Sequence, residues 1–260
     1  RFSTRTIAFI AVFLLLQPFE WIQLIYTLIN NEFIVNPLFD VPYWEIVNTV
    51  QKEGSFLELC KTTIVTGNIA NMGWMLLHGR VTQTAGLFMV GMLIGRSKVF
   101  LYSEENIKLW TNVFIIATFA FFPIYGLAAV LPDFISQETL LIPSTLLLKS
   151  LSNIAFTGIL FAGVILVYYL TKCRGVLHQL APYGRMSLTN YLSQSLIGGF
   201  LFYNWGLGLY RHTGITVCVL MGIGMFFLQF LFCRWWLRSH RQGPLEWLWK
   251  KATWINIRKE

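Results

Sequence analysis

The sequence predicts an all-α, polytopic transmembrane helix bundle of about six spans, and three observations lead to that prediction. Of its 260 residues, 55% are hydrophobic and only 12% are charged, which is about half the charge of a soluble domain. The apolar residues come in long blocks with few charges, and blocks of about 18 residues or more are long enough to cross a bilayer. Lys and Arg gather between these blocks and at the C-terminus, as they do in proteins of the bacterial inner membrane.

The expected spans follow the apolar blocks in order. A long polar segment at residues 30–71 separates the first two, and its part at 43–61 suits a short amphipathic helix. Pro132 is expected to end the third span. The six spans are expected at residues 6–29, 72–94, 109–131, 146–170, 186–209 and 213–237.

The distribution of positive charge predicts the orientation. With the N-terminus inside, fifteen of the twenty Lys and Arg residues fall in inner segments, four fall outside, and Arg80 lies in a span. Both termini are therefore expected in the cytoplasm and residues 30–71 outside the cell, with 1–260 forming a single transmembrane domain. Residues 238–260 are expected to form a cytoplasmic tail whose aromatic and basic part, 244–254, lies along the membrane surface.

Several other classes of function find little support. The net charge of +8 lies in short loops rather than in a basic stripe interleaved with aromatics, so no nucleic-acid partner is expected. The four cysteines form no Cys-x-x-Cys pair and have no histidine at zinc-ligand spacing, so no metal is expected. No inverted repeat is visible, which weakens a transporter interpretation.

The fifth expected span carries a polar stripe. Asn190, Tyr191 and Gln194 stand at helical spacing, with Ser187 before them and Gly198 after. Polar groups in lipid need partners, so the stripe is expected to face the bundle interior. It either bonds neighbouring helices or lines a ligand site.

Three ionisable residues stand inside the first two spans. Arg80 and Glu20 lie at similar depth below the outer surface and could pair. His78 is either an ordinary interior histidine or part of a site. Arg185, at the inner end of the fifth span, is either a membrane anchor or a ligand for an anion. The candidate ligand-binding residues are Arg185, Asn190, Gln194, Tyr191, Arg80 and His78.

Four motifs carry a resemblance to a known family. They are LAPYGRMSLTNYLSQS at 180–195, FY at 202–203 with GLG at 206–208, QGPLEWLW at 242–249 after WLR at 236–238, and QxxGLFxxGMLIGR at 83–96. Together they resemble the C-terminal part of the YeiB family of uncharacterised bacterial membrane proteins, a domain of unknown function numbered 418.

The resemblance implies a longer protein, because family members begin with further spans that carry Asp-x-x-Arg-Gly and Gly-x-x-His-Gly motifs. The start of this chain at Arg1, without Met, agrees with that expectation. The family is distantly similar to membrane acyltransferases that use a histidine from the N-terminal part and move acyl groups onto glycans. The resemblance thus implies part of an acyltransferase with a glycan or lipid acceptor and a donor such as acyl-CoA, whose catalytic histidine is not in this sequence. A transporter or a structural membrane subunit remains the alternative, and the oligomeric state stays open.

Overall fold

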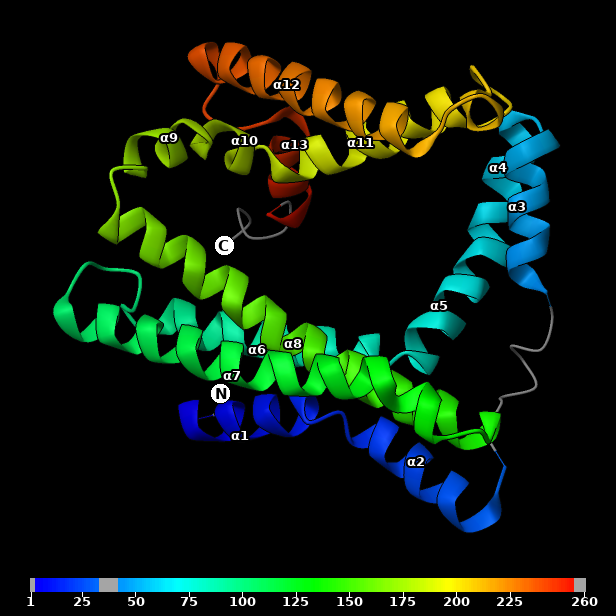
Figure 1. The fold of residues 1–260 in the computed structure, drawn as a ribbon. Helices are drawn as coiled ribbons and strands as arrows, with labels where there is room; N and C mark the ends of the chain where they lie inside the picture. Colours follow the sequence, from blue (N-terminus) through cyan, green and yellow to red (C-terminus); the bar gives the residue numbers. More distant parts are fainter. Residues whose placement is uncertain (1–2, 33–41, 255–260) are drawn as a thin grey trace. The chain divides into compact units, whose positions relative to one another are not determined.

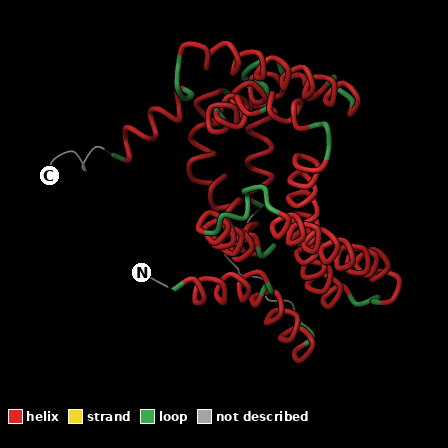
Figure 2. Tube along the Cα trace, turned by 90° about the vertical axis from the view of Figure 1, so that its left-hand side faces the viewer, coloured by secondary structure: helices red, strands yellow, loops and turns green. Residues whose placement is uncertain are grey.

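The computed structural model describes residues 3–32 and 42–254, and every regular element in these ranges is a helix, which confirms the all-α prediction (Figure 1; Figure 2). The expected segment 30–71 and the C-terminal tail therefore lie partly outside the described residues. The helices are α1 (Thr4–Leu15), α2 (Pro18–Asn30), α3 (Tyr43–Glu53), α4 (Phe56–Thr62), the π-helix η2 (Thr63–Gly67), α5 (Asn68–Leu77), α6 (Arg80–Arg96), α7 (Glu104–Phe134), α8 (Glu138–Leu170), α9 (Arg174–Gln179), α10 (Ala181–Arg185), α11 (Ser187–Phe202), the 3-10 helix η3 (Leu209–Arg211), α12 (Ile215–Ser239) and α13 (Pro244–Thr253).

The helices form two compact units. The first unit consists of residues 1–43 and 67–172, and the second of residues 44–66 and 173–260. Each unit is described by itself below.

Four helical segments in the described residues are long and apolar enough to cross a membrane. They are Thr4–Asn30, which joins α1 and α2, together with α7, α8 and α12. These segments correspond to the first, third, fourth and sixth expected spans. Their length and apolar character are those of a membrane protein.

The two other expected spans differ from the prediction. Residues 72–94 do not form one helix: α5 ends at Leu77, and α6 begins at Arg80. Gly79 between them has a φ of 59°, a left-handed conformation that interrupts the helical hydrogen bonds. The fifth is shorter than expected, because α11 has 16 residues and ends at Phe202.

The first segment is also broken, at the Gln17–Pro18 pair that interrupts its apolar run. Gln17 adopts the left-handed conformation with a φ of 59°, and Pro18 then begins α2, where its missing N–H group costs no helical hydrogen bond. The Gln17 side chain is fully buried. The break thus places a polar side chain inside the first unit.

The hairpin of α7 and α8 is the largest element of the first unit, and the two helices run side by side (Figure 1). Trp110, Ala162 and Ile165 form its buried cluster. Both helices are longer than predicted. Pro132 lies inside α7 rather than at its end, and α8 begins at Glu138, eight residues before the expected start of the fourth span.

In the second unit, α3 and α4 occupy the segment where an amphipathic helix is expected. The loop after α11 holds them: the Asn204 backbone N–H donates to Gln51 O at 3.1 Å, and Arg211 Nη2 donates to Lys52 O at 3.3 Å. Ser55 and Glu58 form a capping box at the start of α4. Its hydrogen bonds hold the pKa of the Glu58 carboxyl below its usual value.

Candidate functional site

The break between α5 and α6 positions the two first-unit residues of the predicted site. His78 Nδ1 lies 2.9 Å from Trp74 O, and because a carbonyl can only accept, Nδ1 carries the proton and leaves Nε2 as an acceptor in the neutral ring. Arg80 begins α6, lies over the Trp74 ring at 5.7 Å, and donates from Nη1 to Gln83 Oε1 at 2.9 Å. The break therefore holds an imidazole and a guanidinium beside each other.

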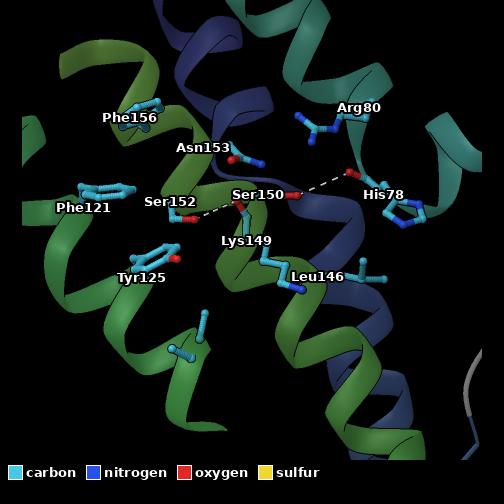
Figure 3. A pocket seen from close by; sticks show the side chains of 12 residues that line it. His78, Arg80, Phe121, Tyr125, Leu146, Lys149, Ser150, Ser152, Asn153 and Phe156 are labelled. Carbon is cyan, nitrogen blue, oxygen red and sulfur yellow. Dashed lines mark hydrogen bonds between the residues drawn. The ribbon is translucent and has the colours of Figure 1, made fainter. Parts of the chain in front are cut away.

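These two side chains line a pocket of about 490 Å³ in the first unit (Figure 3). A volume of this size suits a small ligand or the head of a larger one. Helix α8 contributes a polar side, with Ser150 Oγ donating to His78 O at 3.4 Å, and α7 contributes aromatic side chains. The other lining residues are Phe121, Tyr125, Ala128, Ala129, Leu146, Lys149, Ser152, Asn153 and Phe156.

The charges of this pocket are of one sign. Arg80 and Lys149 line it, and no Asp or Glu is among its lining residues in the described chain. Figure 3 shows the Arg80 guanidinium and the Asn153 amide extending into the same space, while the Lys149 side chain runs toward Leu146. Such a set binds anions, since guanidinium and ammonium groups donate several hydrogen bonds to phosphate or carboxylate oxygens.

Glu20 does not make the ion pair expected from the sequence. Its carboxylate is 1% exposed and packs against Gly79, the residue before Arg80. The Gln17 amide nitrogen donates to Glu20 Oε2 at 3.0 Å, and Glu20 Oε1 has no partner among the described residues. Similar depth in the membrane does not bring the two side chains together, because the Arg80 guanidinium contacts Gln83 and Trp74 instead.

In the second unit, the polar face of α11 meets α10 and α12 in a hydrogen-bonded network. Asn190 Nδ2 donates to Tyr183 O at 3.0 Å, and Gln194 Nε2 donates to Tyr183 Oη and to Gln229 Oε1, each at 2.9 Å. Gln229 Nε2 in turn donates to Asn190 O at 3.1 Å and to Ser193 Oγ at 2.8 Å. Asn190 and Gln194 thus face neighbouring helices and hydrogen-bond to α10 and α12.

The remaining predicted site residues lie apart from this network. Tyr191 is 68% exposed. The exposed Arg185 donates from Nη2 to Arg241 O at 2.7 Å. The six candidates therefore form no single cluster within a unit, because His78 and Arg80 belong to the first unit and the other four to the second.

Two contributions escaped prediction from the sequence. Lys149, Ser150 and Asn153 fall within the fourth expected span without being named as candidates, and they stand on α8 beside the pocket. Gln229 was overlooked, yet it is a lone amide in the apolar segment of α12, and such a residue needs a partner in a membrane. Among residues 3–32 and 42–254, no group of three or more His, Cys, Asp or Glu side chains could hold a metal ion.

A family model described as "Protein of unknown function (DUF418)" matches residues 94–256, which is more than half of the chain. The chain belongs to this family. The DUF418 match includes α7, α8 and the α11 network, whereas His78 and Arg80 precede it.

Three relatives are similar to the chain over shorter stretches. The chain is 42% identical over 93 residues to the uncharacterized protein YxaH of Bacillus subtilis (strain 168), and 46% identical over 74 residues to the uncharacterized protein YeiB of Escherichia coli (strain K12). It is 34% identical over 97 residues to an uncharacterized 39.9 kDa protein in the amylase 3' region of Bacillus acidopullulyticus. These stretches cover 36%, 28% and 36% of this chain, and 23%, 19% and 27% of the relatives. The chain thus spans about a fifth to a quarter of the length of the relatives it matches, and no solved structure matches it.

Proposed function

We propose that the chain crosses the bacterial inner membrane about six times, with both termini in the cytoplasm. Four helical segments have the required length and apolar character. The broken pair α5–α6 and the shorter α11 would supply the other two crossings. A membrane tolerates an interrupted helix where protein covers the non-helical backbone. The fifteen-to-four distribution of Lys and Arg supports the orientation.

Two native cysteines test this topology. Cys60 in α4 would lie outside, and Cys173, just after α8, would lie inside. In spheroplasts carrying proteins with one of these cysteines and the others replaced by Ala, a membrane-impermeant maleimide should label Cys60. Cys173 should react only after permeabilisation. The opposite pattern would invert the proposed topology.

For its biochemical role, we propose that the chain is part of a membrane-embedded acyltransferase that acts on a glycan or lipid acceptor. The observation that carries this proposal is the pocket beside the α5–α6 break, in which cationic groups and no carboxylate stand next to aromatic side chains. An acyl donor such as acyl-CoA has the matching chemistry, because it joins anionic phosphates to an apolar chain.

The lining residues can divide the binding between them. Arg80 and Lys149 would bind the phosphate oxygens, and Phe121, Tyr125 and Phe156 would pack against the apolar part of the ligand. His78 Nε2 would accept a hydrogen bond from an acceptor hydroxyl, since its Nδ1 is already engaged by Trp74 O.

Binding of a non-hydrolysable acyl-CoA to the purified protein tests the role of this pocket. Arg80→Gln and Lys149→Gln should each weaken binding about tenfold, the loss expected for one charge-assisted hydrogen bond. Arg96→Gln at the other end of α6 removes the same charge outside the pocket and should change little. Equal affinities in all three variants would exclude the pocket as the donor site.

A solute transporter is the second candidate, and one observation favours it. The break between α1 and α2 packs against the break between α5 and α6, through Gln17, Glu20 and Gly79. Transporters often build their binding sites from such discontinuous helices. Accumulation of a labelled anion in proteoliposomes, without acyl transfer in the same preparation, would favour transport over catalysis.

A further inference from the structure

A second pocket lies in the other unit, where α12 ends and α13 begins. Its volume is about 840 Å³, and α12, the turn after it and α13 all contribute to its lining. Two contacts hold the turn against α12. Trp236 stacks on His240 with ring centroids 4.0 Å apart, and Trp236 Nε1 donates to Gln242 O at 3.1 Å. The pocket is therefore preformed by the chain itself.

Positive charge dominates this pocket. His240, Arg241 and Lys250 line it. The sequence from 234 to 254 holds five Lys or Arg residues and one acidic residue, Glu246. Glu246 accepts hydrogen bonds from Thr189 N at 3.0 Å and Thr189 Oγ1 at 2.5 Å, so its carboxylate is directed to α11, and it is not among the residues that line the pocket.

The cations that line the pocket have unused hydrogen-bonding capacity. Arg241 accepts a bond from Arg185 through its backbone carbonyl. Its guanidinium and the Lys250 ammonium make no hydrogen bond or ion pair with any described part of the chain. Both groups can therefore turn to a ligand, and a phosphate group would satisfy their donors.

The surroundings of the pocket are apolar and exposed. Leu245, Trp247 and Leu248 line its α13 side, and Trp247 and Leu248 are about half exposed, at 51% and 54%. On the other side stands the end of α12, a helix apolar enough to cross a membrane. Exposed tryptophans beside basic residues at the end of such a helix are typical of the headgroup region of a bilayer.

We propose that this pocket binds the headgroup of an anionic phospholipid, in the leaflet where α12 ends. Arg241 and Lys250 would bind the phosphate, while the acyl chains would lie along the exposed side chains of α12 and α13. Basic pockets at the ends of membrane helices bind anionic lipids in this way. Apolar side chains border the cations of this pocket. A lipid, which joins a phosphate to apolar chains, matches both features, whereas a soluble phosphate matches only the cations.

The test is binding of brominated phosphatidylglycerol to the protein in detergent, measured as quenching of tryptophan fluorescence. Brominated phosphatidylcholine, which carries no net charge, is the reference lipid. The native protein should be quenched at a lower concentration of phosphatidylglycerol than of phosphatidylcholine. Arg241→Gln and Lys250→Gln should each weaken the phosphatidylglycerol response about tenfold, whereas Arg241→Lys should retain most of it.

The control variant is Lys108→Gln in α7, which removes the same charge outside the pocket and should leave the response unchanged. Lys250 is exposed, and exposed side chains seldom determine folding, so Lys250→Gln keeps the proposal testable if Arg241→Gln fails to fold. Equal quenching by the two lipids would overturn the proposal. Displacement of the lipid by millimolar inorganic phosphate would assign the pocket to a soluble anion instead.

Discussion

The buried carboxylate of Glu20 lies directly against the backbone of Gly79, where the chain turns from α5 into α6. A Cβ atom on Gly79 would overlap that carboxylate and the Gln17 amide. Gly79 also has a φ of 59°. Two independent constraints, conformation and space, therefore require glycine at this position.

We accordingly expect Gly79→Ala to destabilise the protein by about 2 kcal/mol or more, since strain at a positive φ adds to overlap with buried groups. Thermal unfolding in detergent measures the change. Gly91→Ala in α6 is the matched control, because no neighbour lies within 4 Å of a Cβ there. It should be neutral or slightly stabilising, and an equal loss in both variants would contradict the argument.

The separation of Glu20 from Arg80 leads to a second prediction. Because the two side chains have different partners, the effects of Glu20→Gln and Arg80→Gln on the unfolding temperature should add in the double variant. Glu20→Gln alone should cost little stability. It removes the buried negative charge of a carboxylate whose Oε1 has no partner, and the glutamine oxygen can still accept the hydrogen bond from the Gln17 amide. If the double variant lost clearly less stability than the sum of the two single losses, the two side chains would interact directly.

Gln229 joins α11 to α12, and its removal is the third prediction. Gln229→Leu removes one hydrogen bond each from Tyr183, Gln194, Ser193 and the Asn190 carbonyl, so it should destabilise the protein by about 1–3 kcal/mol. Leu228→Ala, on the exposed face of the same helix, is the control and should matter much less. Chemical or thermal unfolding in the same detergent distinguishes them. A harmless Gln229→Leu would mean that water or lipid replaces the network.

The fourth prediction concerns pH and the docking of α13. Burial opposes ionisation of Glu246, but the hydrogen bonds from Thr189 outweigh it and hold the pKa of the Glu246 carboxyl below its usual 4.5. Because the pKa is lowered in the folded state, the stabilisation is complete above pH 4.5. It is lost as the pH falls through the folded pKa.

Hydrogen exchange of residues 244–253 reports on this docking. Protection, corrected for the intrinsic exchange rate at each pH, should fall below pH 4.5 in the native protein. In Glu246→Gln it should be lower at neutral pH and vary less with pH. Glu104→Gln, at the start of α7, serves as the control and should behave like the native protein. A pH response that persists in Glu246→Gln would assign it to another group.

The long apolar helices could be predicted from the sequence because hydrophobicity over about 18 residues is a local property. The break at Gly79 could not, because a single glycine inside an expected span is compatible with a continuous helix. Its left-handed conformation depends on the contacts of Gln17 and Glu20, which lie some sixty residues earlier. The fourth span was expected from residue 146, whereas α8 begins at Glu138, because hydrophobicity marks the part of a helix that crosses the membrane and not its polar end.

The polar face of α11 was predicted in part. Asn190 and Gln194 are four residues apart and share a face, whereas Tyr191, one residue after Asn190, points about 100° away from it and is exposed. The partners Tyr183 and Gln229 come from other helices. Helical spacing shows which side chains share a surface, but it does not show which helix covers that surface.

The length of the α7–α8 hairpin has a consequence for the membrane itself. With 31 and 33 residues, these helices are about 46 and 50 Å long, against a hydrocarbon core of about 30 Å. Both helices carry charged residues near their ends, with Glu104 and Asp133 in α7 and Glu138 in α8, and charged side chains are costly inside the hydrocarbon. The ends of the hairpin would therefore extend beyond the apolar core, so that the turn between α7 and α8 stands clear of the bilayer.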